Sequence, residues 1–115
     1  MEQLNRIELR GNVGSIKIQT YGDKHVIRMT MATNYIYKGR DGEPVIETTW
    51  HNVTAWEGKN MPDFNLIGKG EKVHVFGRLR SQRYIGNDGV ERTGYDVLAN
   101  KVVIVDSDEA LACEQ

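Results

Sequence analysis

The sequence has little cysteine and little proline. Its 115 residues include one cysteine, Cys113, and two prolines. One cysteine excludes an internal disulfide framework and fits a reducing compartment. No apolar run approaches the length of a membrane span, and residues 1–5 lack the hydrophobic region of a signal peptide. This length suits one domain, so we expect a single domain with one core. From the cysteine count and the lack of an apolar run, we also expect the protein to be cytoplasmic and to make no contact with a membrane.

A strong net charge is also missing. The formal net charge is −1, so the overall charge of the chain does not indicate what kind of partner it binds. The charge is unevenly placed, because residues 1–105 hold all 15 basic and 12 of the 16 acidic side chains. A body of net charge +3 followed by ten residues of net charge −4 is compatible with a polyanionic ligand. We expect a folded domain at 1–105 and a short, acidic, disordered tail at 106–115.

Motifs typical of catalysis are absent. His25, His51 and His74 fall on different predicted strands, with no cysteine or carboxylate at metal-ligand spacing. The sequence contains no Gly-x-Ser-x-Gly, no Gly-rich phosphate loop and no paired-carboxylate motif. We therefore expect a protein that is not an enzyme and that holds no metal or cofactor.

Five segments have the alternating, β-branched pattern of strands. They are 5–13, 25–33, 48–56, 73–84 and 93–105. Gly11 in the first segment indicates a bend, which Gly14 and Ser15 could extend before the strand resumes. In the last segment, Gly94 or Asn100 is the expected bend.

The connections complete the expected architecture. Residues 34–47 are dense in turn formers and charge, which predicts a long, mobile hairpin loop. Residues 57–70 are the one candidate helix, weakened by Pro62. The sequence Asn-Asp-Gly at 87–89 predicts a hairpin turn. The pattern therefore predicts an all-β chain, a five-stranded OB-fold barrel with one short helix between strands 3 and 4, an architecture that binds oligonucleotides across one sheet face.

The third predicted strand has an unusual face. On 48–56, alternation puts Trp50 and Trp56 on one face, with polar Asn52 and Thr54 between them. Two flat rings with polar spacers suit a wet stacking platform better than a core. The alternative is that both indoles cap the core or fill a subunit interface.

Basic and aromatic groups recur on the outward rows of other strands. Arg78, Arg80 and Tyr84 share one face of the fourth strand, and Arg28 and Thr30 share one face of the second. If these faces join that of the tryptophans, cations and rings interleave on one surface, as single-stranded nucleic acid binding requires. The alternative is that the cations only solvate the outside of the barrel.

Four stretches carry a resemblance to a known family. They are NRIELRGNVG at 5–14, MTMAT at 29–33, TWHNV at 49–53 and KGEKVHVFGRLR at 69–80. Their sequence, order and spacing resemble those of bacterial single-stranded DNA-binding proteins, over roughly residues 4–105. The resemblance implies an OB barrel that binds single-stranded DNA without sequence specificity, in DNA replication, recombination and repair.

The resemblance also implies roles for individual residues. The stacking aromatics would be Trp50, Trp56, Tyr84 and Tyr37. The basic contacts would be Arg80, Arg83, Lys69 and Lys59, beside the pattern-based candidates Arg28, Thr30 and Arg78. Roles in subunit assembly would fall on His51 and His74. Asn52 and Gln82 stand where the family often has basic residues.

The implied partners are single-stranded DNA and further copies of the chain, as a homotetramer or a dimer. Replication and repair proteins stay an open expectation, because 106–115 does not end in the family's acidic segment with terminal Pro-Phe. A replication-restart (primosomal) accessory protein on the same fold, acting mainly through protein partners, is the alternative function. A module that only assembles, burying its aromatics, is a third possibility, and an OB-fold nuclease is a distant fourth.

Overall fold

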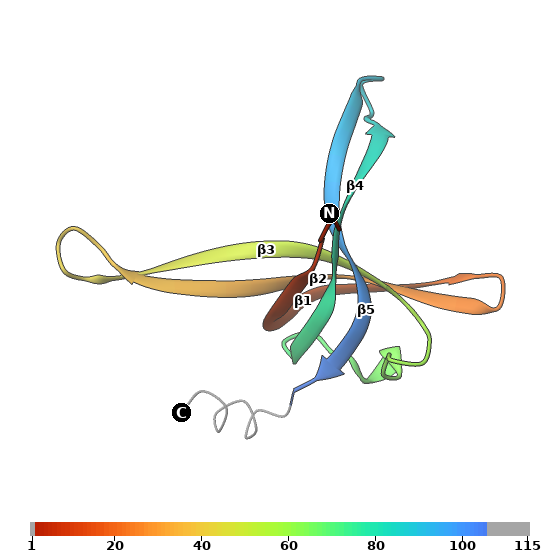
Figure 1. Ribbon diagram of the computed structural model, residues 1–115, viewed down its shortest axis with the longest axis horizontal. Helices are drawn as coiled ribbons and strands as arrows, with labels where there is room; N and C mark the ends of the chain where they lie inside the picture. The colour runs from red at the N-terminus through yellow and green to blue at the C-terminus, as the bar shows by residue number, and fades with distance from the viewer. Residues whose placement is uncertain (1, 106–115) are drawn as a thin grey trace.

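The computed structural model describes residues 2–105, and the expected tail at 106–115 lies outside the described residues. Five strands follow one another along the chain: β1 (Ile7–Tyr21), β2 (Lys24–Lys38), β3 (Pro44–Trp56), β4 (Lys72–Ile85) and β5 (Glu91–Ile104). Within the described part, a 3-10 turn, η1 (Phe64–Leu66), lies between β3 and β4. The strands close into a barrel in the order β1-β2-β3-β5-β4 (Figure 1). The predicted all-β OB-fold barrel, with its short helical segment after the third strand, is confirmed.

The strands are longer than predicted, and their ends project as hairpin arms. Figure 1 shows the β2–β3 hairpin and the β1–β2 hairpin extending to opposite sides, while the β4–β5 hairpin rises away from both. All neighbouring pairs are antiparallel except β3 and β5, which are parallel. The three arms therefore project from the barrel in different directions.

The prediction of a long loop at 34–47 is wrong. Strands β2 and β3 stay paired out to Lys38 and Pro44, so that the turn takes up only residues 39–43. Ile36 lies opposite Ile46 on this arm, and cross-strand pairs of β-branched residues sustain a ladder. The turn chemistry is concentrated at the tip, where Gly42 has a φ of 84°.

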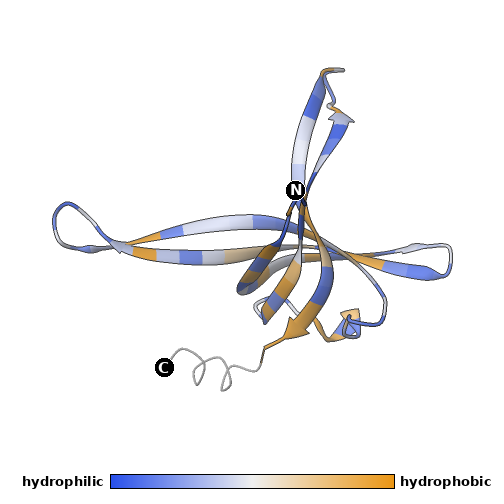
Figure 2. Ribbon diagram, viewed as in Figure 1, coloured by the Kyte–Doolittle hydropathy of each residue, from blue (hydrophilic) through white to orange (hydrophobic). Residues whose placement is uncertain are grey.

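The core fills the barrel with the inward rows of all five strands. Phe64 and Ile67, from the η1 segment, add to it. The buried hydrophobic cluster consists of Val13, Ile27, Met29, Met31, Val53, Ala55, Phe64, Ile67, Val73, Val75, Val97, Ala99 and Val102. Figure 2 shows hydrophobic colours on the strands around the barrel and mainly hydrophilic colours along the rising β4–β5 hairpin. In the described residues, no helix has the length and apolar character needed to cross a membrane.

Two irregularities bend the strands. On β1 the register with β2 shifts between Val13 and Ile16, so Gly14 and Ser15 form a bulge. On β5 the partner of Phe76 is Lys101 and that of Gly77 is Ala99, which leaves Asn100 as an extra residue. Of the two candidates for a bend in this strand, Asn100 is therefore the one that the structure shows, whereas Gly94 pairs regularly with Gln82.

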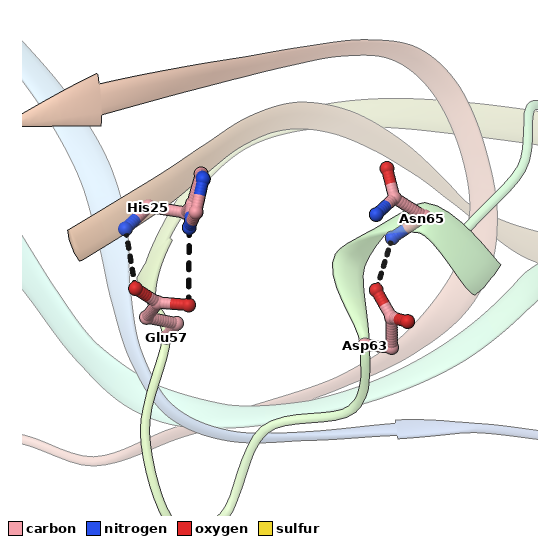
Figure 3. Close-up of polar contacts among 4 residues, drawn as sticks. All are labelled: His25, Glu57, Asp63 and Asn65. Atoms are coloured by element: carbon pink, nitrogen blue, oxygen red, sulfur yellow. Dashed lines mark hydrogen bonds and ion pairs between the residues drawn. The ribbon is translucent and has the colours of Figure 1, made fainter. Parts of the chain in front are cut away.

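The link from β3 to η1 is held by two carboxylates (Figure 3). Glu57 accepts a hydrogen bond from the backbone N–H of His25 at 2.8 Å, and its other oxygen lies 3.2 Å from the His25 ring Nδ1. The backbone bond is the main cause that lowers the pKa of Glu57. Asp63 caps η1 by accepting the N–H of Asn65 at 3.0 Å. The Glu57 bonds therefore tie the start of the link to β2, and the Asp63 bond holds the first turn of η1.

Candidate nucleic-acid interface

Strand pairing brings two of the predicted faces together. Arg28 lies opposite Thr54, and Thr30 lies opposite Asn52. Since residues directly opposite in an antiparallel pair share a face, Arg28 and Thr30 join the face that carries Trp50 and Trp56. The roles of these residues in binding stay predictions.

A groove of about 640 Å³ opens between this face and the β4–β5 hairpin. It contains four cations and two tyrosine rings but one acid among its described lining residues. Ser15, Thr30, Asn52, Thr54 and Gln82 add hydrogen-bonding groups to its wall. The charged and aromatic lining residues are Lys17, Arg28, Arg80, Arg83, Tyr84, Tyr95 and Asp96.

One lateral line of polar residues, which we call the polar row, crosses all five strands. Lys17 lies opposite Arg28 across β1 and β2, and Arg28 lies opposite Thr54 across β2 and β3. The Thr54 hydroxyl donates to Oδ2 of Asp96 at 2.9 Å. Asp96 in turn lies opposite Arg80 across β5 and β4. The polar row therefore runs Lys17, Arg28, Thr54, Asp96, Arg80.

The row ends in a bidentate ion pair. Arg80 donates from Nε to Oδ1 of Asp96 at 3.0 Å and from Nη2 to Oδ2 at 2.8 Å. The Asp96 side chain is 13% exposed and that of Arg80 is 28% exposed. The bonds from Arg80 lower the pKa of Asp96, and the same bonds raise the pKa of Arg80. Both groups are therefore charged and partnered at neutral pH.

Trp50 lies over the β1 bulge rather than in the groove. Its side chain is exposed, with 60% of the residue accessible. A Cβ on Gly14 would lie 2.5 Å from Cζ3 of the Trp50 ring. The bulge is fixed beside the ring because Thr30 Oγ1 accepts the N–H of Ser15 at 2.9 Å. A glycine at this position lets the indole lie against the β1 backbone.

Trp56 forms an aromatic pair with Tyr21. The ring centroids are 5.7 Å apart and the planes are tilted by 45°. Trp56 lies opposite Val26, which is fully buried although it stands outside the core cluster. The two residues remain 41% and 47% exposed, so this pair is available for contact.

Tyr37 lies on the β2–β3 arm, where its ring is 6.0 Å from that of Tyr35. Of the four predicted stacking residues, only Tyr84 lines the groove. Trp50, Trp56 and Tyr37 occupy three other places around the barrel, so the predicted platform is distributed over several elements. The remaining predicted cations also lie outside the groove: Arg78 on β4, and Lys59 and Lys69 in the segments flanking η1.

The two histidines assigned to subunit assembly do not line the groove. Nε2 of His51 lies 2.8 Å from the Thr33 hydroxyl, and burial lowers the pKa of this imidazole. Nε2 of His74 lies 2.6 Å from Oε2 of Glu8, and its ring stacks on Phe76 at 4.5 Å. Within residues 2–105, no group of three or more His, Cys, Asp or Glu side chains could hold a metal ion.

Sequence reasoning missed several residues of this surface. Asp96 could have been found by counting outward from the 87–89 turn, because regular pairing of Ile85 with Glu91 puts Arg80 opposite Asp96. Tyr95 carries no such signal, because counting puts it opposite Ser81 and alternation puts it on the other face of β5 from Asp96. Lys17 carries a weaker signal, as the polar residue between Ile16 and Ile18. No signal in the sequence indicated that Gly14 lies beneath Trp50.

A closed five-stranded barrel with cations and rings across one face defines an oligonucleotide-binding type of β-barrel. The model of the Single-strand binding protein family matches residues 4–105. The chain therefore belongs to the single-strand binding protein family.

Relatives and solved structures agree with this membership. The chain is 33% identical over 102 residues to a single-stranded DNA-binding protein of Neisseria meningitidis, covering 86% of this chain and 58% of that protein. It thus spans little more than half the length of this bacterial relative. The chain also resembles the Plasmodium falciparum SSB in complex with ssDNA, with a TM-score of 0.70, 29% identity, and coverage of 92% of this chain and 98% of that one. A single-stranded DNA-binding protein from Thermus aquaticus, at 20% identity and a TM-score of 0.71, shares the fold over 90% of this chain and 51% of that one.

Proposed function

We propose that this protein binds single-stranded DNA without sequence preference. The observation that carries the proposal is the groove, which combines four cations with Tyr84 and Tyr95 beside a strand that displays two exposed indoles. The similarity to the Plasmodium falciparum SSB, whose structure includes ssDNA, supports the same ligand for this chain.

Binding has two physical components. Lysine and arginine side chains neutralise phosphates and release counterions, which makes the affinity depend on salt. Trp50, Trp56, Tyr84 and Tyr37 stack on bases, at about 1–3 kcal/mol per base. Stacking tolerates any sequence because every base has a π face. The basic contacts are assigned to Arg28, Arg78, Arg83, Lys59 and Lys69, with Thr30 as a hydrogen-bonding neighbour.

The wider role is inferred from membership of the single-strand binding protein family. The folded domain, residues 1–105, protects single strands during DNA replication, recombination and repair in the cytoplasm, as a binding protein rather than an enzyme. Subunits assemble as a homotetramer through surfaces that include His51 and His74. Light scattering during size-exclusion chromatography tests this assembly, and a dimer with a short DNA site would fit the replication-restart alternative instead.

The test of DNA binding is intrinsic tryptophan fluorescence during titration with oligo(dT), at low and high salt. Saturable quenching that weakens with salt is expected, and its end point gives the nucleotides covered per subunit. Tyr84→Ala should weaken binding by about 1–3 kcal/mol, whereas Tyr84→Phe, which keeps the ring, should bind as the unmodified protein does. Absence of both quenching and a mobility shift would mean that the indoles are structural and that the chain only assembles.

A further inference from the structure

The groove contains one group that DNA binding does not call for. Asp96 places a negative charge among the cations that are proposed to capture phosphates. Its carboxylate accepts hydrogen bonds from Arg80 and Thr54, at 2.8–3.0 Å. With its side chain only 13% exposed, Asp96 is satisfied inside the protein and not by solvent.

The bond geometry decides what Arg80 can still do. A guanidinium binds carboxylate or phosphate bidentately through two parallel N–H groups. In Arg80, the edge formed by Nε and Nη2 is occupied by the two oxygens of Asp96. The Nη1 side keeps its donors, but the positive charge behind them is compensated by the carboxylate. If Arg80 turned to a phosphate, Asp96 would be left ionised and mostly buried without its main partner, which is unfavourable. The Arg80–Asp96 pair has no net charge, so it does not attract a phosphate.

The cations at the opposite end of the polar row differ. Lys17 and Arg28 lie directly across from each other on β1 and β2, and both are exposed. Among the described residues, neither has a side-chain hydrogen bond or an ion pair with a carboxylate, although Arg28 lies close enough to Asp96 to help lower the pKa of that carboxyl. Their charges are therefore available to a polyanion. On the β4–β5 hairpin, Arg83 lies 3.4 Å from Glu91, but both side chains are exposed, so solvent screens this pair and Arg83 also remains available to a phosphate.

We infer that Asp96 is an internal counter-ion that removes Arg80 from phosphate binding, so that Lys17 and Arg28, together with the exposed Arg83, carry phosphate capture in the groove. Arg80 is then a positioning residue, which ties β4 to β5 and, through Asp96 and Thr54, to β3. This inference rests on the proposed function, and it replaces the sequence-based assignment of Arg80 as a basic contact. It also assigns a DNA contact to Lys17.

The experiment compares the salt dependence of oligo(dT) binding among variants. For single strands, the slope of log K against log salt is about −0.7 for each phosphate neutralised. Arg28→Gln and Lys17→Gln should each make the slope shallower by about 0.7. The double variant Arg80→Gln with Asp96→Asn, which removes the pair as a unit, should keep the slope of the unmodified protein. Asp96→Asn alone, which frees the guanidinium charge, should steepen the slope by about 0.7.

The outcomes separate the two levels of the proposal. If the unmodified protein does not bind oligo(dT), the proposed function fails. If it binds but the double variant loses as much slope as Arg28→Gln, only the counter-ion role of Asp96 fails. A further readout avoids any variant: in NMR spectra, oligo(dT) should shift the Nε–H signal of Arg28 and leave that of Arg80 in place. A large shift at Arg80 would overturn the inference.

Discussion

At the scale of single residues, Gly14 determines where the Trp50 ring lies. An added Cβ would lie 2.5 Å from the ring and 2.9 Å from Thr30 Oγ1, so Gly14→Ala must displace the indole. We expect weaker binding of oligo(dT), by at most the roughly 1–3 kcal/mol of one stacked base, together with reduced tryptophan quenching. Gly58→Ala is the matched control, because the nearest atom to its added Cβ is 3.9 Å away. Equal affinity of both variants would show that Trp50 does not stack on DNA.

His51 gives the fold a pH dependence whose sign can be worked out. Burial lowers its pKa in the folded protein, so the unfolded chain takes up a proton first as the pH falls. Stability is therefore complete above the unfolded pKa of about 6.5 and declines from there down to the lowered folded value. Urea unfolding of the unmodified protein should give a lower free energy at pH 5.5 than at pH 7.5. His51→Gln should lack this part of the decline, and an unchanged pH dependence would contradict the prediction.

At the scale of elements, Asn5 extends the contact between β1 and β4 beyond the last backbone pair. Its side chain donates to the Leu79 carbonyl at 2.7 Å and accepts the Leu79 N–H at 3.0 Å. Asn5→Ala should lower the free energy of unfolding by about 1 kcal/mol, because both bonds are exposed and each contributes modestly. Urea denaturation measures this loss, with Gln3→Ala as the control. A midpoint equal to that of the control would mean that water replaces both bonds without cost.

The elements also show what the sequence could predict. The alternation of apolar and polar residues identified the side chains that face the core, because an apolar side chain such as that of Met29 or Val53 is stable only on the inner face of a barrel. The 34–47 segment was misassigned because turn residues were weighed over the whole segment, whereas pairing of Ile36 with Ile46 extends the ladder to the tip. The groove could not be predicted as a unit. Its walls come from strands that are distant in sequence, and only barrel closure places Arg28 near Arg80.

At the scale of the whole molecule, the low net charge limits how strongly salt controls binding. Once Arg80 is set aside, at most six of the cations assigned above to DNA contacts remain to neutralise phosphates, and they are named at the end of this paragraph. With about 0.7 per neutralised phosphate, the slope of log K against log salt should be no steeper than about −4 per subunit. Titration with oligo(dT) across a range of salt concentrations gives this value. A slope near −7 would require phosphate contacts well beyond this set. The six cations are Lys17, Arg28, Lys59, Lys69, Arg78 and Arg83.

The barrel closes along one short parallel seam. Strands β3 and β5 share three register pairs, which join Val53, Thr54 and Ala55 to Val97, Leu98 and Ala99. Pairing between such distant segments is slow, in the range of milliseconds to seconds. During synthesis, β5 leaves the ribosome after all the other strands. A growing chain can thus form its β2–β3 arm early, with three of its four proposed stacking residues, but the groove is complete only when β5 arrives with Tyr95 and Asp96.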